Sequence, residues 1–163
     1  MKEIQLTQGK IALVDDADFE RVNAYKWCYA NGYAATRSKD GKRGGKNIYM
    51  HSFITGVVDT DHIDFNGLNN QRHNLRAATR SQQQMHRRVW GQRKYKGVYL
   101  SSPQWGKMRA KPWFSQIQIE GKQIHLGYFL TEEEGAIAYN EAAIKLFGEF
   151  AVLNNIQPCD KIS

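Results

Sequence analysis

The C-terminal part of the chain carries the pattern that most restricts the possible folds. Three runs between residues 95 and 129 alternate apolar and polar side chains, and Glu120-Gly121-Lys122 separates the last two runs. Alternation with a period of two is typical of half-buried strands, and a short polar break between such runs is typical of a hairpin. The pattern predicts a three-stranded antiparallel sheet, formed by YKGVYL, WFSQIQI and KQIHLGYF.

A helix is predicted directly after this sheet. Thr131 can cap the helix N-terminus, Glu134 stands three residues later as in a capping box, and Gly148 can end the helix. Apolar residues recur between these points at helical spacing, namely Ala136, Tyr139, Ala143, Leu146 and Phe147. We expect the helix to cover one face of the sheet and to bury Val98, Ile117, Ile119, Ile124 and Leu126.

The earlier parts of the chain have weaker patterns. Residues 1 to about 50 predict short strands and turns, including a hairpin around Asn31-Gly32. The region that follows is rich in Asn, Asp and Gly, which favours a loop with brief strand pieces. After it, RSQQQMHRRV favours a short helix with Thr79 or Ser81 near its N-cap. The whole pattern indicates the α+β class.

Basic residues are concentrated in the middle of the chain. The net charge is +7, and no acidic residue occurs between Asp64 and Glu120. Such a stretch is either a solvated basic face or a surface that follows nucleic-acid phosphates, and its length favours the second interpretation. Its basic members are Arg72, Arg76, Arg80, Arg87, Arg88, Arg93, Lys94, Lys96, Lys107, Arg109 and Lys111.

Several protein classes are disfavoured by composition. No apolar run approaches the roughly 18 residues of a membrane span, and the N-terminus MKEIQLTQGK lacks the apolar core of a signal peptide. We therefore expect a cytoplasmic protein that is not secreted. The two cysteines, Cys28 and Cys159, form no CxxC pair, which excludes a cysteine-bound zinc knuckle. We expect Cys28 to be a buried small apolar residue and Cys159 to be a thiol in the tail.

A polar cluster in the middle of the chain has the residue types that phosphodiester cleavage needs. Asp61 and His62 are adjacent, and Asn66, Asn69, Asn70, His73 and Asn74 follow closely. A carboxylate can bind a hard divalent cation, a neutral imidazole can take a proton from water, and an amide can orient the imidazole. From the residues alone, the alternative of an ordinary turn with a structural histidine stays open.

The spacing Asp61-His62-Ile63-Asp64, then Asn69-Asn70, then Asn74-Leu75-Arg76, resembles the HNH family of phage and intron-encoded homing endonucleases. Their pattern is roughly DHIDGN, NN, NLR and then a helix. The resemblance implies a ββα-metal (His-Me finger) fold, with His62 as general base, Asp61 as metal ligand and Asn74 holding His62 in position. It implies one divalent cation, Mg²⁺ or alternatively Mn²⁺. For Asn70 we favour a role in tying the loop together over a catalytic one.

One position departs from this family. The second metal ligand, usually His or Asn nine residues after the middle Asn, is Gln83 here, with Gln82, Gln84 and His86 as neighbouring substitutes. A glutamine oxygen can bind a hard cation, but its longer stem is less preorganised. His51 matches a histidine that often precedes the motif, and we favour a structural or phosphate-contacting role for it.

Residues 94–154 resemble a second family, the APETALA/ethylene-response-factor (AP2/ERF) DNA-binding domain. The resemblance rests on Tyr95-Lys96-Gly97-Val98, Trp113, Ile117, Leu126-Gly127-Tyr128-Phe129, Thr131-Glu132-Glu133, Ala138-Tyr139-Asn140-Glu141-Ala142-Ala143, Gly148 and the run from Ala151 to Asn154. It implies that the exposed sheet face lies in the DNA major groove. Tyr99, Gln118, Gln123 and His125 stand where plant members have Arg or Trp, so specificity is either shifted or weak.

Together the two resemblances predict a DNA-cutting protein with double-stranded DNA as its partner and no evident obligate protein partner. The expected segments are 1–50 completing the nuclease core, 51–90 as the HNH motif, 91–94 as linker, 95–155 as the DNA-binding domain and 156–163 as tail. The expected DNA-contacting residues are Arg76, Arg80, Arg87, Arg88, Lys94, Lys96, Tyr99, Lys107, Arg109, Lys111, Gln116, Gln118, Gln123 and His125.

Two functions remain open at this point. The first is an endonuclease that nicks one strand as a monomer, in a host-cell cytoplasm if it is phage-encoded. The second is a DNA-binding regulator with an impaired HNH remnant, and a purely structural protein is a third, less favoured alternative.

Overall fold

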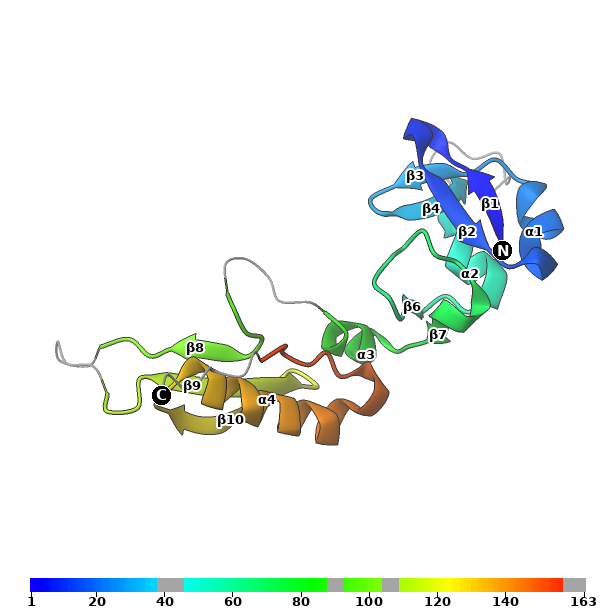
Figure 1. Ribbon diagram of the computed structural model, residues 1–163. Coiled ribbons are helices and arrows are strands. Elements are labelled where there is room, and N and C mark those ends of the chain that lie inside the picture. Colours follow the sequence, from blue (N-terminus) through cyan, green and yellow to red (C-terminus); the bar gives the residue numbers. More distant parts are fainter. Residues whose placement is uncertain (38–45, 88–92, 104–108, 157–163) are drawn as a thin grey trace. The chain divides into compact units, whose positions relative to one another are not determined.

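In the computed structural model the chain divides into two units, residues 1–79 and residues 80–163, each with its own hydrophobic core (Figure 1). The structure describes residues 1–37, 46–87, 93–103 and 109–156. Small antiparallel sheets and a few helices make up both units, which is compatible with the predicted α+β class. Among the described residues, no helix has the length and apolar character that a membrane span requires.

The first unit is built from short hairpins and two helices (Figure 1). Strands β1 (Lys2–Gln5) and β2 (Ile11–Val14) pair and lead into α1 (Asp16–Asn23). A second sheet has the order β3-β4-β5, and α2 (Met50–Thr55) follows its last strand. Its strands are β3 (Cys28–Ala30), β4 (Tyr33–Arg37) and β5 (Asn47–Tyr49). The predicted hairpin at Asn31-Gly32 is confirmed, since both residues have positive φ angles between β3 and β4.

A third pair of strands completes the first unit. Strand β6 (Thr60–His62) pairs with β7 (Leu75–Ala77), and a long polar loop with the 3-10 turn η2 (Arg72–Asn74) connects them. One core joins this pair to the N-terminal segment, formed by Ile4, Leu6, Ala12, Val14, Val22, Trp27, Ala34, Met50, Ile54 and Leu75. Residues 1–37 therefore support the segment that carries the candidate site.

Two helices in this unit were not predicted, because their patterns are short. Helix α1 buries only Asp18 and Val22, so it has almost no apolar stripe that a sequence pattern could reveal. Its two acidic residues in the first turn stabilise it by their interaction with the positive, N-terminal end of the helix dipole. Helix α2 has six residues and ends at Gly56, whose φ of +74° suits glycine. The expectation that Cys28 is buried is wrong, because it is exposed on β3; Cys159 lies outside the described residues.

The second unit begins with α3 (Arg80–Met85), the short helix that the sequence predicts there. The boundary therefore falls after Thr79, and residues 80–87 belong with the C-terminal sheet. That sheet is the predicted antiparallel one, with the order β10-β9-β8 and a bulge between His125 and Gly127. Its strands are β8 (Val98–Leu100), β9 (Trp113–Ile119) and β10 (Lys122–Phe129).

Helix α4 (Glu132–Phe147) covers one face of this sheet, as predicted. The Thr131 side chain accepts from the Glu134 amide at 3.2 Å, and Glu134 accepts in return from the Leu130 amide. Val98 and Ile117 are buried, whereas Ile124 is 39% exposed on edge strand β10, so its predicted burial is wrong. The 3-10 turn η3 (Gly148–Phe150) follows the helix.

Asn154 fastens the end of the second unit to its beginning. Its side chain bonds to the backbone N–H and C=O of Lys96, and its own backbone bonds to the side chain of Asn140 on α4. Asn140 and Asn154 therefore have a structural role, because their hydrogen bonds join the end of this unit to α4 and to Lys96.

Candidate active site

The loop between β6 and β7 is organised around Asp64. Its Oδ1 accepts from the Asn66 amide at 2.8 Å and from Asn74 Nδ2 at 2.9 Å, while Oδ2 accepts from Asn69 Nδ2 at 2.8 Å. Asn74 closes the network, because its Oδ1 accepts from the Asp64 amide and its Nδ2 also donates to the Asn69 carbonyl. Burial raises the pKa of Asp64, but these hydrogen bonds outweigh it and lower the pKa overall. Asp64 therefore stays ionised as the centre of a rigid loop.

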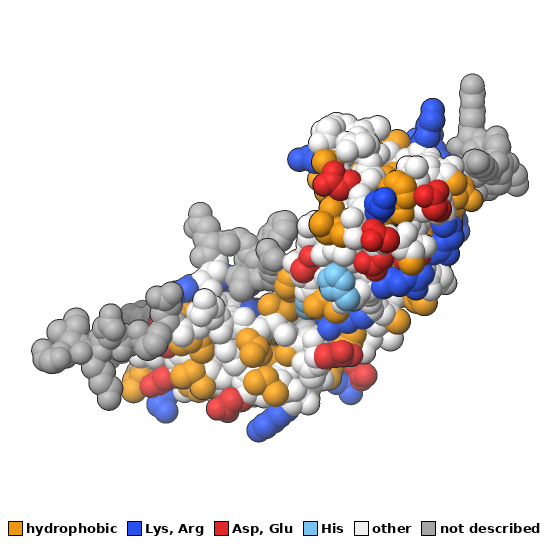
Figure 2. Space-filling model, turned by 45° about the vertical axis from the view of Figure 1, so that its right-hand side comes forward, with side chains coloured by type: hydrophobic (Ala, Val, Ile, Leu, Met, Phe, Trp, Pro, Cys, Tyr) orange, Lys and Arg blue, Asp and Glu red, His pale blue; other side chains and the backbone are white. Residues whose placement is uncertain are grey.

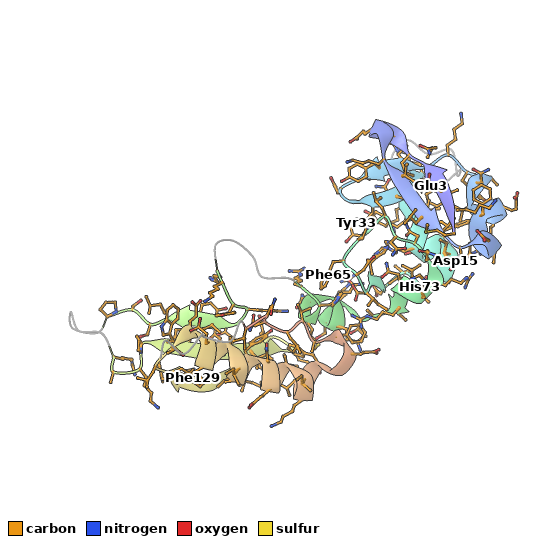
Figure 3. All side chains as sticks on the ribbon, viewed as in Figure 1. Glu3, Asp15, Tyr33, Phe65, His73 and Phe129 are labelled. Atoms are coloured by element: carbon orange, nitrogen blue, oxygen red, sulfur yellow. The ribbon has the colours of Figure 1, made fainter. Side chains whose placement is uncertain are left out.

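The N-terminal segment holds the far end of this loop. Asp15 accepts from the Arg72 amide at 2.7 Å and from Gln71 Nε2 at 3.1 Å, and buried Asp18 binds the Arg72 guanidinium at 2.7 Å. Arg21 adds a second ion pair to Asp18. Hydrogen bonds from Arg72 and its positive charge lower the pKa of Asp18 against the opposing effect of burial. Figure 3 shows Asp15 close to His73, and Figure 2 shows acidic and basic side chains interleaved on the visible face of this unit.

The His62 ring is held by Asn70. The His62 Nε2 and Asn70 Oδ1 atoms are 3.4 Å apart, and both residues are buried. An amide oxygen only accepts, so this contact places the ring proton on Nε2 and leaves the lone pair on Nδ1. No residue in the described ranges makes a hydrogen bond to Nδ1. Burial lowers the pKa of His62, opposed by the Asn70 bond and by the charges of Asp64 and Asp61.

Aromatic rings surround His62 on its buried side. His51 contacts it edge-on with 5.0 Å between ring centroids, and Tyr33 lies at 5.7 Å. Tyr49 stacks on His51 at 5.4 Å. Burial and the neighbouring His62 lower the pKa of His51 to about 4, so His51 is neutral and adds no positive charge next to His62. His51 is therefore a buried neighbour of His62, which agrees with the structural one of its two predicted roles.

Asp61 faces a basic partner. On paired strands Asp61 stands opposite Arg76 and His62 stands opposite Leu75. Arg76 donates to Asp61 Oδ2 from both Nε, at 3.1 Å, and Nη2, at 2.9 Å. Within the described part of the chain, no group of three or more His, Cys, Asp or Glu side chains could hold a metal ion. A hard cation that uses one carboxylate together with phosphate oxygens and water needs no such group, and Asp61 has the right chemistry for it.

One predicted role differs from the observed contacts. The sequence assigned the orientation of His62 to Asn74, but Asn74 bonds Asp64 and the Asn69 carbonyl, and Asn70 contacts the imidazole instead. The reason is that Asn74 precedes β7 and faces into the loop, where its two polar atoms match the Asp64 backbone and carboxylate. Gln83, predicted as the second metal ligand, lies on α3 with Gln82 and Gln84, and His86 directly follows that helix.

The exposed face of the second sheet carries aromatic and amide side chains opposite α4. Phe114 stacks on Tyr99 at 5.3 Å and contacts His125 and Tyr128 on β10. Arg93 lies over Tyr99 and Arg109 over Tyr128, each 4.7 Å from the ring centroid. Gln118, Gln123, His125, Arg80, Arg87, Lys94, Arg109 and Lys111 are exposed, and Gln116 is half-buried. Gln116 and Gln118 also line a pocket with Ser81 and Gln84 of α3.

Two of the predicted DNA-contacting lysines are engaged within the unit. Lys96 Nζ donates to the Met85 and Arg87 carbonyls, each at 2.6 Å, so this ammonium fixes the end of α3 rather than facing outward. Burial lowers the pKa of Lys96 to about 8. Lys94 is exposed but forms an ion pair with Glu133 at 2.6 Å. Arg88 and Lys107 lie outside the described residues.

Comparison with known proteins gives one informative match. The chain is 30% identical over 153 residues, covering 91% of its length, to a protein described as an uncharacterized HNH endonuclease of Acanthamoeba polyphaga mimivirus, of which the match covers 77%. No family model matches the chain. No solved structure matches it either.

Proposed function

The chain belongs to the HNH endonuclease family, and on this premise we propose that it hydrolyses phosphodiester bonds of double-stranded DNA. His62 acts as the general base, and a divalent cation, Mg²⁺ or Mn²⁺, binds at Asp61. The observation that carries the proposal is the His62–Asn70 contact, which leaves an imidazole lone pair available beside a carboxylate.

His62 takes a proton from the attacking water through Nδ1. Asn70 keeps the proton on Nε2 and stabilises the imidazolium that forms, since its oxygen accepts a hydrogen bond in both states. Asp64 and Asp61 favour the same protonated ring by their charge. A general base of this kind contributes roughly 10² to 10⁴ in rate.

Asp61 contributes charge at the other side of the scissile phosphate. A cation held there would neutralise the phosphate and the departing oxygen. The chain itself presents the Asp61 carboxylate, which pairs with Arg76. The Arg76 guanidinium can turn from Asp61 to a phosphate oxygen, because the carboxylate and the phosphate are both anions.

The second unit anchors the DNA in this proposal. Its exposed sheet face presents Tyr99, Gln118, Gln123 and His125, which can contact base edges, as the AP2/ERF resemblance implies. Lys111 and Arg109 supply charge for the phosphates, which position the protein without specifying sequence. Lys96 does not belong to this surface, because its ammonium donates hydrogen bonds to the backbone carbonyls of Met85 and Arg87 at the end of α3.

One active site cuts one strand, so the monomer should nick. The Asp61–Arg76 ion pair also favours the alternative of a DNA-binding protein with an impaired site, because it occupies the predicted metal ligand.

Supercoiled plasmid with Mg²⁺ separates the two functions. We expect nicked circles from the wild type, none with EDTA, and a loss of about 10² or more in His62→Ala. His73→Ala, an exposed histidine of the same loop, is the matched control and should cut normally. Plasmid binding without nicking, with or without His62, would support the regulator instead.

A further inference from the structure

The side chain of His62 is almost completely covered, although its proposed role requires contact with water and a phosphate. It is 5% exposed, and within the described ranges three side chains contact its ring, namely Asn70, His51 and Tyr33. Asn70 and His51 are themselves buried, whereas Tyr33 is 40% exposed. Of these three neighbours, Tyr33 is therefore the one that a DNA strand meets on its way to the His62 ring.

The ring of Tyr33 is held in place on several sides. Besides His62, it contacts Tyr49 and His51 edge-on, with 5.9 Å and 5.7 Å between ring centroids. The loop between β6 and β7 closes on it at Gly67, where a Cβ atom would lie 2.6 Å from Tyr33 Cδ1 and 2.7 Å from Cε1. A side chain at Gly67 would have to displace the ring, so the absence of a Cβ permits this close approach. Tyr33 therefore has a fixed position beside His62.

The hydroxyl group of Tyr33 is available for a ligand. It makes no hydrogen bond with any residue in the parts of the chain that the structure describes. A phenol hydroxyl can donate as well as accept, and without a protein partner it bonds to water. Figure 3 shows Tyr33 along the same edge of the first unit as Phe65, which belongs to the loop between β6 and β7, while Asp15 lies on the opposite side.

We propose that the Tyr33 hydroxyl donates a hydrogen bond to a non-bridging oxygen of the scissile phosphate. This rests on the proposed function, because the phosphate must lie beside His62. The ring centroids of Tyr33 and His62 are 5.7 Å apart. Hydrogen bonds of about 3 Å from the imidazole to the attacking water and from the hydroxyl to the phosphate can span this separation.

A donor at this place acts on the reaction and not only on binding. Negative charge on the non-bridging oxygens grows as the water oxygen bonds to phosphorus. A donor that is already fixed there stabilises the transition state more than the bound DNA. Tyr33 would then be a catalytic residue that supplies no proton and no metal ligand.

The alternative use of an exposed aromatic ring beside DNA is stacking on a base or a sugar. The ring of Tyr33 is already packed against three aromatic side chains and Gly67. These contacts occupy the ring more than the hydroxyl, which favours a contact through the hydroxyl.

The variant Tyr33→Phe separates the hydroxyl from the ring. We expect single-turnover plasmid nicking to fall by about 10- to 100-fold, because one donor to a developing oxyanion is lost, while the melting temperature stays unchanged. Tyr29→Phe is the matched control and should nick as the wild type does. Strand pairing places Tyr29 opposite Ala34 and Tyr33 opposite Ala30, so the two tyrosines lie on opposite faces of the sheet. Nicking by Tyr33→Phe at the wild-type rate would overturn the proposal and leave stacking as the use of the ring.

Sulfur substitution at the scissile phosphate locates the contact. After the nick has been mapped, a synthetic duplex carries a phosphorothioate of either configuration at that bond. Sulfur is a weak acceptor, so with sulfur at the oxygen that Tyr33 contacts, we expect Tyr33→Phe to cost less than about twofold. The full loss should remain with the other configuration and with ordinary phosphate. Equal losses on all three substrates would refute the contact. A wild type that nicks nothing would refute the cleavage and this proposal together, whereas normal nicking by Tyr33→Phe refutes the hydroxyl contact alone.

Discussion

Arg76 and Asp61 form an ion pair across strands β6 and β7, with 2.9 Å between Nη2 and Oδ2. Their side chains are only 13% and 14% exposed. A divalent cation at Asp61 would therefore meet a guanidinium that already neutralises the carboxylate. When no cation is present, the Arg76 guanidinium compensates the negative charge of the Asp61 carboxylate. The same ion pair opposes the binding of a metal ion to that carboxylate.

Replacing Arg76 should tighten metal binding. A unit charge about 4 Å away is worth about 1 kcal/mol in water and about 4 kcal/mol near a protein surface, so we expect Arg76→Gln to lower the half-saturating Mg²⁺ concentration at least fivefold. Nicking rates measured against Mg²⁺ concentration test this. Arg37→Gln, which removes an exposed charge on β4, should leave the Mg²⁺ dependence unchanged. An unchanged or higher Mg²⁺ requirement in Arg76→Gln would mean that Arg76 does not compete with the cation.

Asn70 and Asn74 should have separable roles. Asn70→Ala removes the partner of the His62 ring, so we expect nicking to fall by about 10- to 100-fold with little loss of stability. Asn74→Ala removes three side-chain hydrogen bonds around Asp64. It should cost roughly 2–3 kcal/mol and lower the melting temperature by about 10 °C or more. Thermal melting and nicking of both variants are the measurements, and equal losses of stability in the two would contradict the assignment.

The sequence predicted the second unit well because its signals are local. Alternating strands, the Glu120-Gly121 turn and the Thr131 cap each specify their own structure within a few residues. The edge position of Ile124 depends on which strand is outermost, and no local pattern encodes that.

The candidate site was harder to predict because its contacts span the chain. The resemblance assigned the orientation of His62 to Asn74, but the choice between Asn70 and Asn74 depends on how the loop closes on Asp64, which the motif does not encode. The Asp15 and Asp18 contacts to Arg72 join residues more than 50 positions apart.

Acid should weaken the first unit through Asp18. Its pKa is lowered from 3.8 in the folded state, first by the hydrogen bond from Arg72. A lowered folded pKa contributes stability above the unfolded pKa, and this stability is lost as the pH falls through the folded value.

Asp18→Asn weakens the three charge-assisted hydrogen bonds that Asp18 accepts from Arg72 and Arg21. Because both arginines are largely exposed to solvent, we expect it to be less stable than the wild type at pH 7 by roughly 2–3 kcal/mol. We expect the difference to shrink below pH 3.8. Urea unfolding of both proteins between pH 2 and pH 7 measures it, and Glu20→Gln, exposed on the same helix, is the control. A difference that is constant over this range would show that Asp18 acts by shape alone.

The salt dependence of DNA binding should distinguish Lys96 from Lys111. Each lysine that contacts a phosphate contributes about 0.9 to the slope of log affinity against log salt concentration. Lys111 is exposed, so Lys111→Gln should reduce the slope by about that amount. Lys96→Gln should leave the slope unchanged and lower the melting temperature, because the carbonyls of Met85 and Arg87 lose their donor. Lys145→Gln, exposed on α4, should change neither. Fluorescence anisotropy titrations at several salt concentrations provide the slopes. An equal reduction of the slope in Lys96→Gln and Lys111→Gln would show that Lys96 contacts a DNA phosphate as Lys111 does.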